Sequence, residues 1–254
     1  MYKFAFFTLF LLLPWAVLLS QGPPIFTDTP IMLGLEGGGV RTFGKYVKKE
    51  NTKIYIQPIA LPFNLRANWQ IGAILPFIGK WPRDAQGYFG LGDVKVFSKY
   101  QLHAWNGKGK TFRTLVKLVQ SFPSGKEPLG SDRWTTSLGL ASGLINLKYG
   151  LYANLNYQRS SGPNPDKLTY NLALAYPLLP QQYPPKQLNI YLEFNGSYVF
   201  GLQQNAYFLS PGLQWIQGRK FLIETGLQIP LREDVVENVR TRFAFLFGLR
   251  ALLF

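Results

Sequence analysis

The sequence predicts an all-β protein, a transmembrane antiparallel β-barrel of about twelve strands. Three observations lead to this prediction. Alternating apolar and polar residues recur along nearly the whole chain, an apolar export signal precedes them, and an aromatic amphipathic segment ends the chain. A strand points successive side chains to opposite faces, so in a membrane barrel the apolar face meets lipid and the polar face lines the lumen.

Residues 1–20 have the features of a secretory signal peptide. Residues 1–3 give a short positive start, and residues 4–19 are almost entirely apolar. This apolar run is short for a membrane-spanning helix. We expect cleavage after Ser20, although Leu18 stands where alanine is usual. A retained signal anchor is the alternative.

The remainder is expected to form one domain, because no linker or low-complexity tract divides it. We expect a periplasmic N-terminal segment over residues 21–30 and the barrel over residues 31–254. Beyond the signal, no apolar run approaches the length of a transmembrane helix. The chain contains 20 Phe, 14 Tyr and 6 Trp, which suits aromatic girdles at the two membrane interfaces. It contains no cysteine, which excludes a lipid-anchored N-terminus and a disulfide framework.

Turn-forming residues divide the domain into twelve candidate strands. They lie near 31–43, 53–61, 65–76, 89–103, 110–122, 133–145, 148–158, 167–177, 187–200, 205–217, 219–230 and 238–254. The first has the weakest pattern, because Gly37-Gly38-Gly39 supplies no side chains. The ninth has a clear one, with Leu192 on its apolar face and Glu193 on its polar face. An even count lets the first and last strands pair and removes the free edges; ten or fourteen strands are alternatives.

The connections support this topology. If the chain enters from the periplasm, the outer loops include Lys45–Thr52, Phe77–Tyr88, Pro123–Asp132, Ser160–Asp166 and Arg232–Glu237. The inner turns include Pro62–Asn64, Asn146–Leu147 and Gly218. Outer loops are longer than periplasmic turns in barrels of this class. Two connections, Ala104–Gly109 and Leu178–Lys186, are long for inner turns.

The C-terminus resembles the signal that the outer-membrane assembly machinery reads, an amphipathic strand closed by a terminal phenylalanine. Phe243, Phe245 and Phe247 alternate with other residues, and the chain ends on Phe254. The terminal Phe254 falls in the opposite phase from the other three. A bulge around Arg250–Leu252 would bring them into one phase.

Three motifs resemble those of a family of outer-membrane transporters named after the meta-cleavage pathway of phenol degradation. They are Gly90-Leu91-Gly92-Asp93-Val94-Lys95 with Ser98-Lys99-Tyr100, then Phe122-Pro123-Ser124-Gly125-Lys126, then Leu209-Ser210-Pro211-Gly212-Leu213-Gln214. The resemblance covers most of residues 27–254. It implies an outer-membrane barrel that passes small compounds, aromatic ones among them. It supplies no catalytic residues and no cofactor.

The formal net charge is +14, and part of this charge is expected to face the lumen. Strand parity points seven charged side chains inward, and we expect them to line a pore: Arg66, Lys95, Lys99, Arg113, Lys117, Glu193 and Glu224. The five cations lie on adjacent strands and the two acids about half a circumference away. A cationic wall facing an anionic one would create a field across a water-filled pore and attract counter-ions. The alternative is that these groups pair across a closed lumen and fill it.

Other cations are expected at the membrane surface. Lys45, Lys48, Lys49, Lys53, Lys80 and Arg83 fall near the first two outer loops, where they suit the phosphates of lipopolysaccharide in the outer leaflet. Nucleic-acid binding is not expected, because the basic residues are scattered and form no compact basic helix.

Catalysis is weighed as an alternative, because some outer-membrane barrels modify lipids with a histidine near a serine or carboxylate. The chain has one histidine, His103, at the periplasmic end of the fourth strand, and Ser98 lies on the lipid face of that strand. We expect His103 to be an interfacial side chain, and we expect no metal or other cofactor. The sequence therefore favours a channel for passive or facilitated diffusion of small solutes, aromatic or anionic. A structural or adhesive barrel with a plugged lumen is the main rival, and a lipid-modifying enzyme is third.

Overall fold

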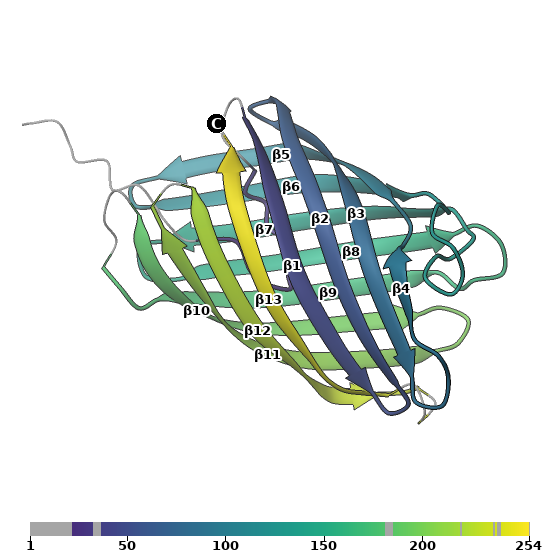
Figure 1. Ribbon diagram of the computed structural model, residues 1–254. Helices are drawn as coiled ribbons and strands as arrows, with labels where there is room; N and C mark the ends of the chain where they lie inside the picture. The colour runs from purple at the N-terminus through teal and green to yellow at the C-terminus, as the bar shows by residue number, and fades with distance from the viewer. Residues whose placement is uncertain are drawn as a thin grey trace, which may run out of the picture.

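Thirteen antiparallel strands make up the computed structural model (Figure 1), which describes residues 22–32, 37–180, 185–218, 220–235, 237 and 240–253. The strands are β1 (Gly37–Lys49), β2 (Thr52–Arg66), β3 (Trp69–Pro82), β4 (Tyr88–Leu91), β5 (Lys95–Gly107), β6 (Lys110–Ser121), β7 (Thr135–Asn146), β8 (Gly150–Ser160), β9 (Lys167–Pro177), β10 (Lys186–Val199), β11 (Gln204–Gln217), β12 (Phe221–Glu233) and β13 (Thr241–Leu253). Within the described ranges, no helix is long and apolar enough to cross a membrane.

The sheet closes into a barrel of twelve wall strands, as predicted. Each wall strand pairs with its neighbours along the chain, and β1 pairs with β13 to complete the ring (Figure 1). The predicted fourth strand is interrupted. Its first part, β4, pairs with residues 77–80 of β3, and its second part, β5, pairs with residues 69–74 of β3. Residues Gly92–Val94 connect the two parts.

The alternation predicted from the sequence sorts side chains between lipid and lumen. On β10, Ile190 and Leu192 are 39% and 49% exposed on the outer face, whereas Glu193 between its apolar neighbours is 0% exposed. The same division holds on β12, where Phe221 and Leu227 are exposed and Glu224 is buried. The outside of the wall is therefore an apolar belt, as a membrane requires.

The connections differ in length at the two ends of the barrel. The described chain enters β1 and leaves β13 at the same end, which also carries the short turns after β2, β5 and β7. We take this end as periplasmic, because barrels of this class have short periplasmic turns. The expected long connection over 104–109 is not found, because β5 continues to Gly107 and turns over two residues at Gly109, where φ is 69°. Only the connection between β9 and β10 remains long there.

The described residues show no bulge near Arg250–Leu252 that would bring Phe254 into phase with the other phenylalanines. β13 pairs with β1 in continuous register from Leu253 to Phe243, and the register shifts only between Lys48 and Lys49. Phe245 and Phe247 consequently face outward, and Arg250 lies on the inner face with Leu246. Phe254 and the predicted signal peptide over 1–20 lie outside the described residues.

Candidate functional site

The lumen contains the chain's own N-terminal segment, residues 22–32, which we call the plug. In Figure 1 its purple trace runs inside the ring, behind β1 and β13. Most of its residues are buried, although they belong to no strand. The sequence predicts a periplasmic segment over 21–30. The structure differs, because residues 22–30 bind polar side chains that point into the barrel.

Glu193 holds the middle of the plug. Its Oε1 accepts the backbone N–H of Ile25 at 2.7 Å, and its Oε2 accepts that of Thr27 at 2.6 Å. The N–H of Phe26 lies 3.1 Å from both oxygens. Three consecutive amide groups thus converge on one buried carboxylate. Hydrogen bonds to a charged acceptor are the strong ones, and they offset the cost of burying this charge.

Side chains from β8, β10 and β11 hold the start of the plug. Tyr191 and Tyr152 donate hydroxyl hydrogen bonds to the carbonyl oxygen of Gly22, at 2.7 and 3.2 Å. Gln214 donates to the carbonyl of Pro23 at 2.7 Å. Gly212 leaves room for the plug, because a Cβ there would lie 2.3 Å from Cδ1 of Ile25. The third sequence motif, residues 209–214, therefore contacts the N-terminal segment directly.

Asp28 joins the plug to the cationic wall. Its carboxylate lies 2.7 Å from Nζ of Lys117 and 3.8 Å from Nζ of Lys99, and its backbone N–H donates to Asn154 Oδ1 at 3.4 Å. Burial alone would raise the pKa of Asp28, but the charges of Lys117 and Lys99 hold it below its ordinary value. Asp28 is therefore ionised at neutral pH and bridges the two lysines.

Apolar contacts complete the plug's attachment. Ile25 packs in a buried cluster with Ile145, Tyr191 and Leu246, and Met32 packs with Leu115 in a second one. Full burial of an aliphatic side chain of this size is worth about 1.5–3 kcal/mol. The plug is thus bound by both polar and apolar contacts, at points spread around the barrel.

The two predicted acids do not form an open anionic wall. Glu193 is bound to plug amides, and Glu224 accepts a hydrogen bond from Arg41 at 2.7 Å. Arg250, on the neighbouring strand β13, lies near both Arg41 and Glu224. The part of the wall predicted to be anionic therefore carries cations too.

The other predicted site residues fall in different places. Lys95 faces inward near the outer end of β5, and Arg113 faces inward near the periplasmic end of β6, where its side chain lies 3.4 Å from Gln101 Oε1. Arg66 differs from the prediction. A register shift after Asn64 places it opposite Trp69, whose side chain faces lipid, and Arg66 is exposed at the periplasmic rim.

Several luminal charges were not predicted. Lys45, expected at the lipopolysaccharide surface, instead points inward and donates to Gln228 at 3.0 Å. It lies within electrostatic reach of Lys167. Arg41 and Asp28 were also missed. The predicted first strand ends at residue 43 and therefore leaves out Lys45. Its glycine-rich pattern gave no parity for Arg41, and Asp28 precedes every predicted strand.

A loop covers part of the outer mouth. Residues 122–134 connect β6 to β7, and Lys80, on the inner face of β3, donates a hydrogen bond to the carbonyl of Pro128. Asp93 fixes the loop: its Oδ1 accepts the N–H of Gly125 at 3.0 Å, and its Oδ2 accepts that of Ser131 at 2.9 Å. A Cβ on Gly125 would lie 2.8 Å from the backbone of Gly92. The first two sequence motifs therefore meet in space and anchor this loop.

Behind the loop lies a cavity of about 700 Å³, which we call the outer cavity. Lys49 and Lys80 contribute cations to it, Glu127 comes from the loop, and Tyr88 comes from the start of β4. Lys49 and Lys80 were expected to meet lipid phosphates, so their place inside the mouth is a correction. Lys53 and Arg83 are exposed, as a surface role requires.

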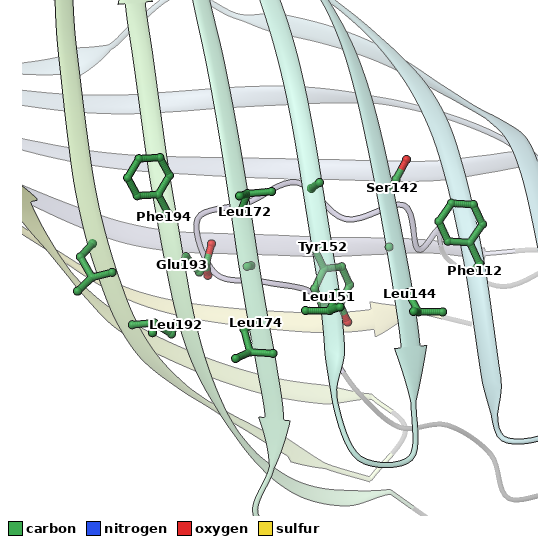
Figure 2. A pocket seen from close by; sticks show the side chains of 14 residues that line it. Phe112, Ser142, Leu144, Leu151, Tyr152, Leu172, Leu174, Leu192, Glu193 and Phe194 are labelled. Atoms are coloured by element: carbon green, nitrogen blue, oxygen red, sulfur yellow. The ribbon is translucent and has the colours of Figure 1, made fainter.

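A second hollow lies on the lipid-facing surface, not in the lumen. This groove of about 490 Å³ crosses β6 to β11. Figure 2 shows Leu172, Leu174 and Leu192 on its near face, whereas Glu193 lies behind the strands, beside the plug. Its apolar lining suits lipid chains along the wall.

His103 lies near the periplasmic end of β5, where its ring stands 5.9 Å from that of Phe112, a residue exposed on the outer face. This matches an interfacial position. Across the described residues, no three His, Cys, Asp or Glu side chains gather in a way that could hold a metal ion.

Solved structures with the same architecture place the fold. The COG4313 outer-membrane channel from Pseudomonas putida F1 is similar with a TM-score of 0.68 and 13% sequence identity, over 92% of this chain and 100% of that chain. The fold is that of a bacterial outer-membrane barrel. The NanC porin is similar at 0.59 with 8% identity, over 84% and 100% of the two chains. The β domain of the Bordetella autotransporter BrkA is similar at 0.55 with 13% identity, over 85% and 99%.

With its apolar belt, the fold confirms the predicted location in the outer membrane. It does not select a function, because channels, porins and an autotransporter domain share it. No protein-family model matches the sequence, and no match was found among curated proteins. The phenol-degradation family therefore stays a resemblance of motifs.

Proposed function

We propose that this outer-membrane barrel is a channel for small solutes, that it prefers anions, and that the plug occludes it at rest. One observation carries the proposal. Among the described residues, the inward-facing Lys45, Lys95, Arg113, Lys167 and Arg250 form none of the ion pairs, although the plug fills part of the lumen. These side chains are half-buried, and a purely structural filling would be expected to pair them, because an unpaired charge withdrawn from water is costly. A path for anions explains why they are retained.

The rival is a structural or adhesive barrel whose lumen stays closed. The plug favours it, because residues 22–32 are bound from several strands at once. Ion conductance in a planar bilayer separates the two. A channel shows discrete conductance steps, whereas a permanently closed barrel shows none under any condition.

We expect the open pore to select anions through its cationic lining. The test is the reversal potential across a salt gradient, for the wild type and for a double variant, Lys95→Glu with Arg113→Glu. Neither side chain contacts the plug by a hydrogen bond or ion pair that the described residues show, so the exchange changes lining charge and leaves the anchors in place. The preference should weaken as salt rises, because charges are screened beyond about 10 Å at 0.1 M.

Cation selectivity in the wild type would contradict this expectation. So would an unchanged reversal potential in the double variant, because these side chains would then not line the conducting path.

Two further roles belong to the same proposal. Lys48, Lys53 and Arg83 at the outer rim would meet lipopolysaccharide phosphates, and Phe254 would present the C-terminus to the assembly machinery. We propose no catalytic role, because His103 stands against Phe112 on the outer face of the wall.

A further inference from the structure

Lys99 and Lys117 are directly opposite each other in the β5–β6 ladder. Directly opposed like charges destabilise a sheet. Lys95, on β5 like Lys99, is near enough to Lys117 to add to the repulsion. The positive charges of Arg41 and Arg250 also repel Lys99. The wall thus concentrates positive charge at one place in the lumen, and an anion bound there would relieve it.

Asp28 is that anion in the structure. It is the one acid in the first 35 residues of the chain, and the plug delivers it to the two lysines. Its carboxylate carries no other side-chain ion pair that the described residues show. The site is not sealed, because the Asp28 side chain is 34% exposed and those of Lys117 and Lys99 are 20% and 14% exposed. A solute in the lumen can therefore reach it.

Other inward-facing cations lie between this site and the outer end of the barrel. Lys49 and Lys80 line the outer cavity, Lys45 and Lys167 lie within electrostatic reach of each other, and Lys95 lies within electrostatic reach of Lys117. Successive cations of this kind pass an anion inward while no single one holds it permanently.

We propose that Lys99 and Lys117 form a binding site for small organic carboxylates, and that Asp28 occupies it as a built-in competitor. A carboxylate solute that displaces Asp28 removes the plug's ionic anchor on β5 and β6 and shifts the plug toward release. This inference deepens the proposed channel function and rests on it. The solute class, small organic carboxylates, is inferred from the Asp28 carboxylate that the two lysines already bind. Binding that favours the released state shifts the population by the difference in affinity between the two states.

The test follows the plug directly and does not depend on conductance. The chain has no cysteine, so Thr29→Cys places a single thiol in the plug, beside Asp28 at a position 8% exposed. The rate of labelling by a small uncharged maleimide is measured on the refolded mature protein. Sodium propionate replaces sodium chloride at constant ionic strength, and propionamide serves as the uncharged probe of the same shape.

Propionate should speed the labelling several-fold and in a saturable way, and propionamide should leave it unchanged. With Asp28→Asn added, labelling should be fast already and insensitive to propionate. The matched control is Asp234→Asn, which removes an acid paired with Arg232 at the exposed outer end of the barrel. This control should behave like the Thr29→Cys background.

No acceleration by propionate in the background would overturn the site. Equal acceleration with Asp28→Asn would also overturn it, because the anion would then act elsewhere. The channel proposal fails separately. If labelling responds to propionate but no variant conducts ions, the carboxylate site is supported and the channel proposal is contradicted. If the protein conducts ions but labelling does not respond to propionate, the channel is supported and the carboxylate site is contradicted.

Discussion

Replacing Leu192 with arginine should lower the free energy of unfolding by about 2–4 kcal/mol, the cost of a cation on the lipid face near the membrane midplane. Leu192 lies in the middle of β10, is 49% exposed on the outer face, and is flanked in the sheet by Leu174 and Pro211. The measurement is denaturant unfolding of protein refolded into phospholipid vesicles, followed by tryptophan fluorescence.

The control must lie on the luminal face of the same strand. Asn195 is the natural choice from sequence alone, but it is bonded to Asn171, Ser210 and Gln228, so an arginine there would disrupt packing. Ser197→Arg, two residues further on the same face and only partly buried, is the better control. It should cost much less than Leu192→Arg. Equal costs would mean that the two faces are assigned wrongly.

Replacing Glu193 with glutamine should free the plug. The amide group presents N–H donors where the carboxylate accepts three backbone N–H groups, and it removes the charge that strengthens those bonds. A hydrogen bond to a charged group contributes about 1.5–3 kcal/mol. Loss of even one such bond should accelerate hydrogen exchange at the amides of Ile25, Phe26 and Thr27 about tenfold to a hundredfold. Exchange mass spectrometry of the peptide that contains them measures this.

Glu224→Gln is the matched control. Glu224 is a luminal glutamate, 1% exposed, that binds Arg41 and forms no hydrogen bond or ion pair with the described residues of the plug. Exchange at residues 25–27 should stay slow in this variant. Fast exchange in both variants would show that any change to the luminal charges loosens the barrel, and that Glu193 has no specific role.

The wall of the barrel could be predicted from sequence because it depends on a local rule. Alternation at Leu192 and Glu193 is fixed by the period of a strand, and no distant contact is needed to place those side chains. Boundaries were harder. The pattern for β1 fails at three glycines, so its register with β13 decides where it lies, and that pairing joins the two ends of the chain.

The plug could not be predicted, because nothing local marks it. Ile25, Phe26 and Thr27 are bound through backbone amides, which every sequence has, and their partner is a glutamate far along the chain. Asp28 offered the one hint, an acid ahead of a strongly basic domain. Likewise, strand parity places Lys99 and Lys117 on the inner face, but only the ladder shows that they oppose each other.

Deletion of residues 22–32 tests most directly whether the N-terminal segment closes a conducting lumen. Single-channel recording in a planar bilayer should compare this variant with the protein that starts at residue 21, after both are shown to refold into barrels. We expect the full chain to open rarely or with small steps, and the deletion variant to show larger, long-lived, anion-selective steps. The same conductance in both proteins, or none in either, would contradict the account.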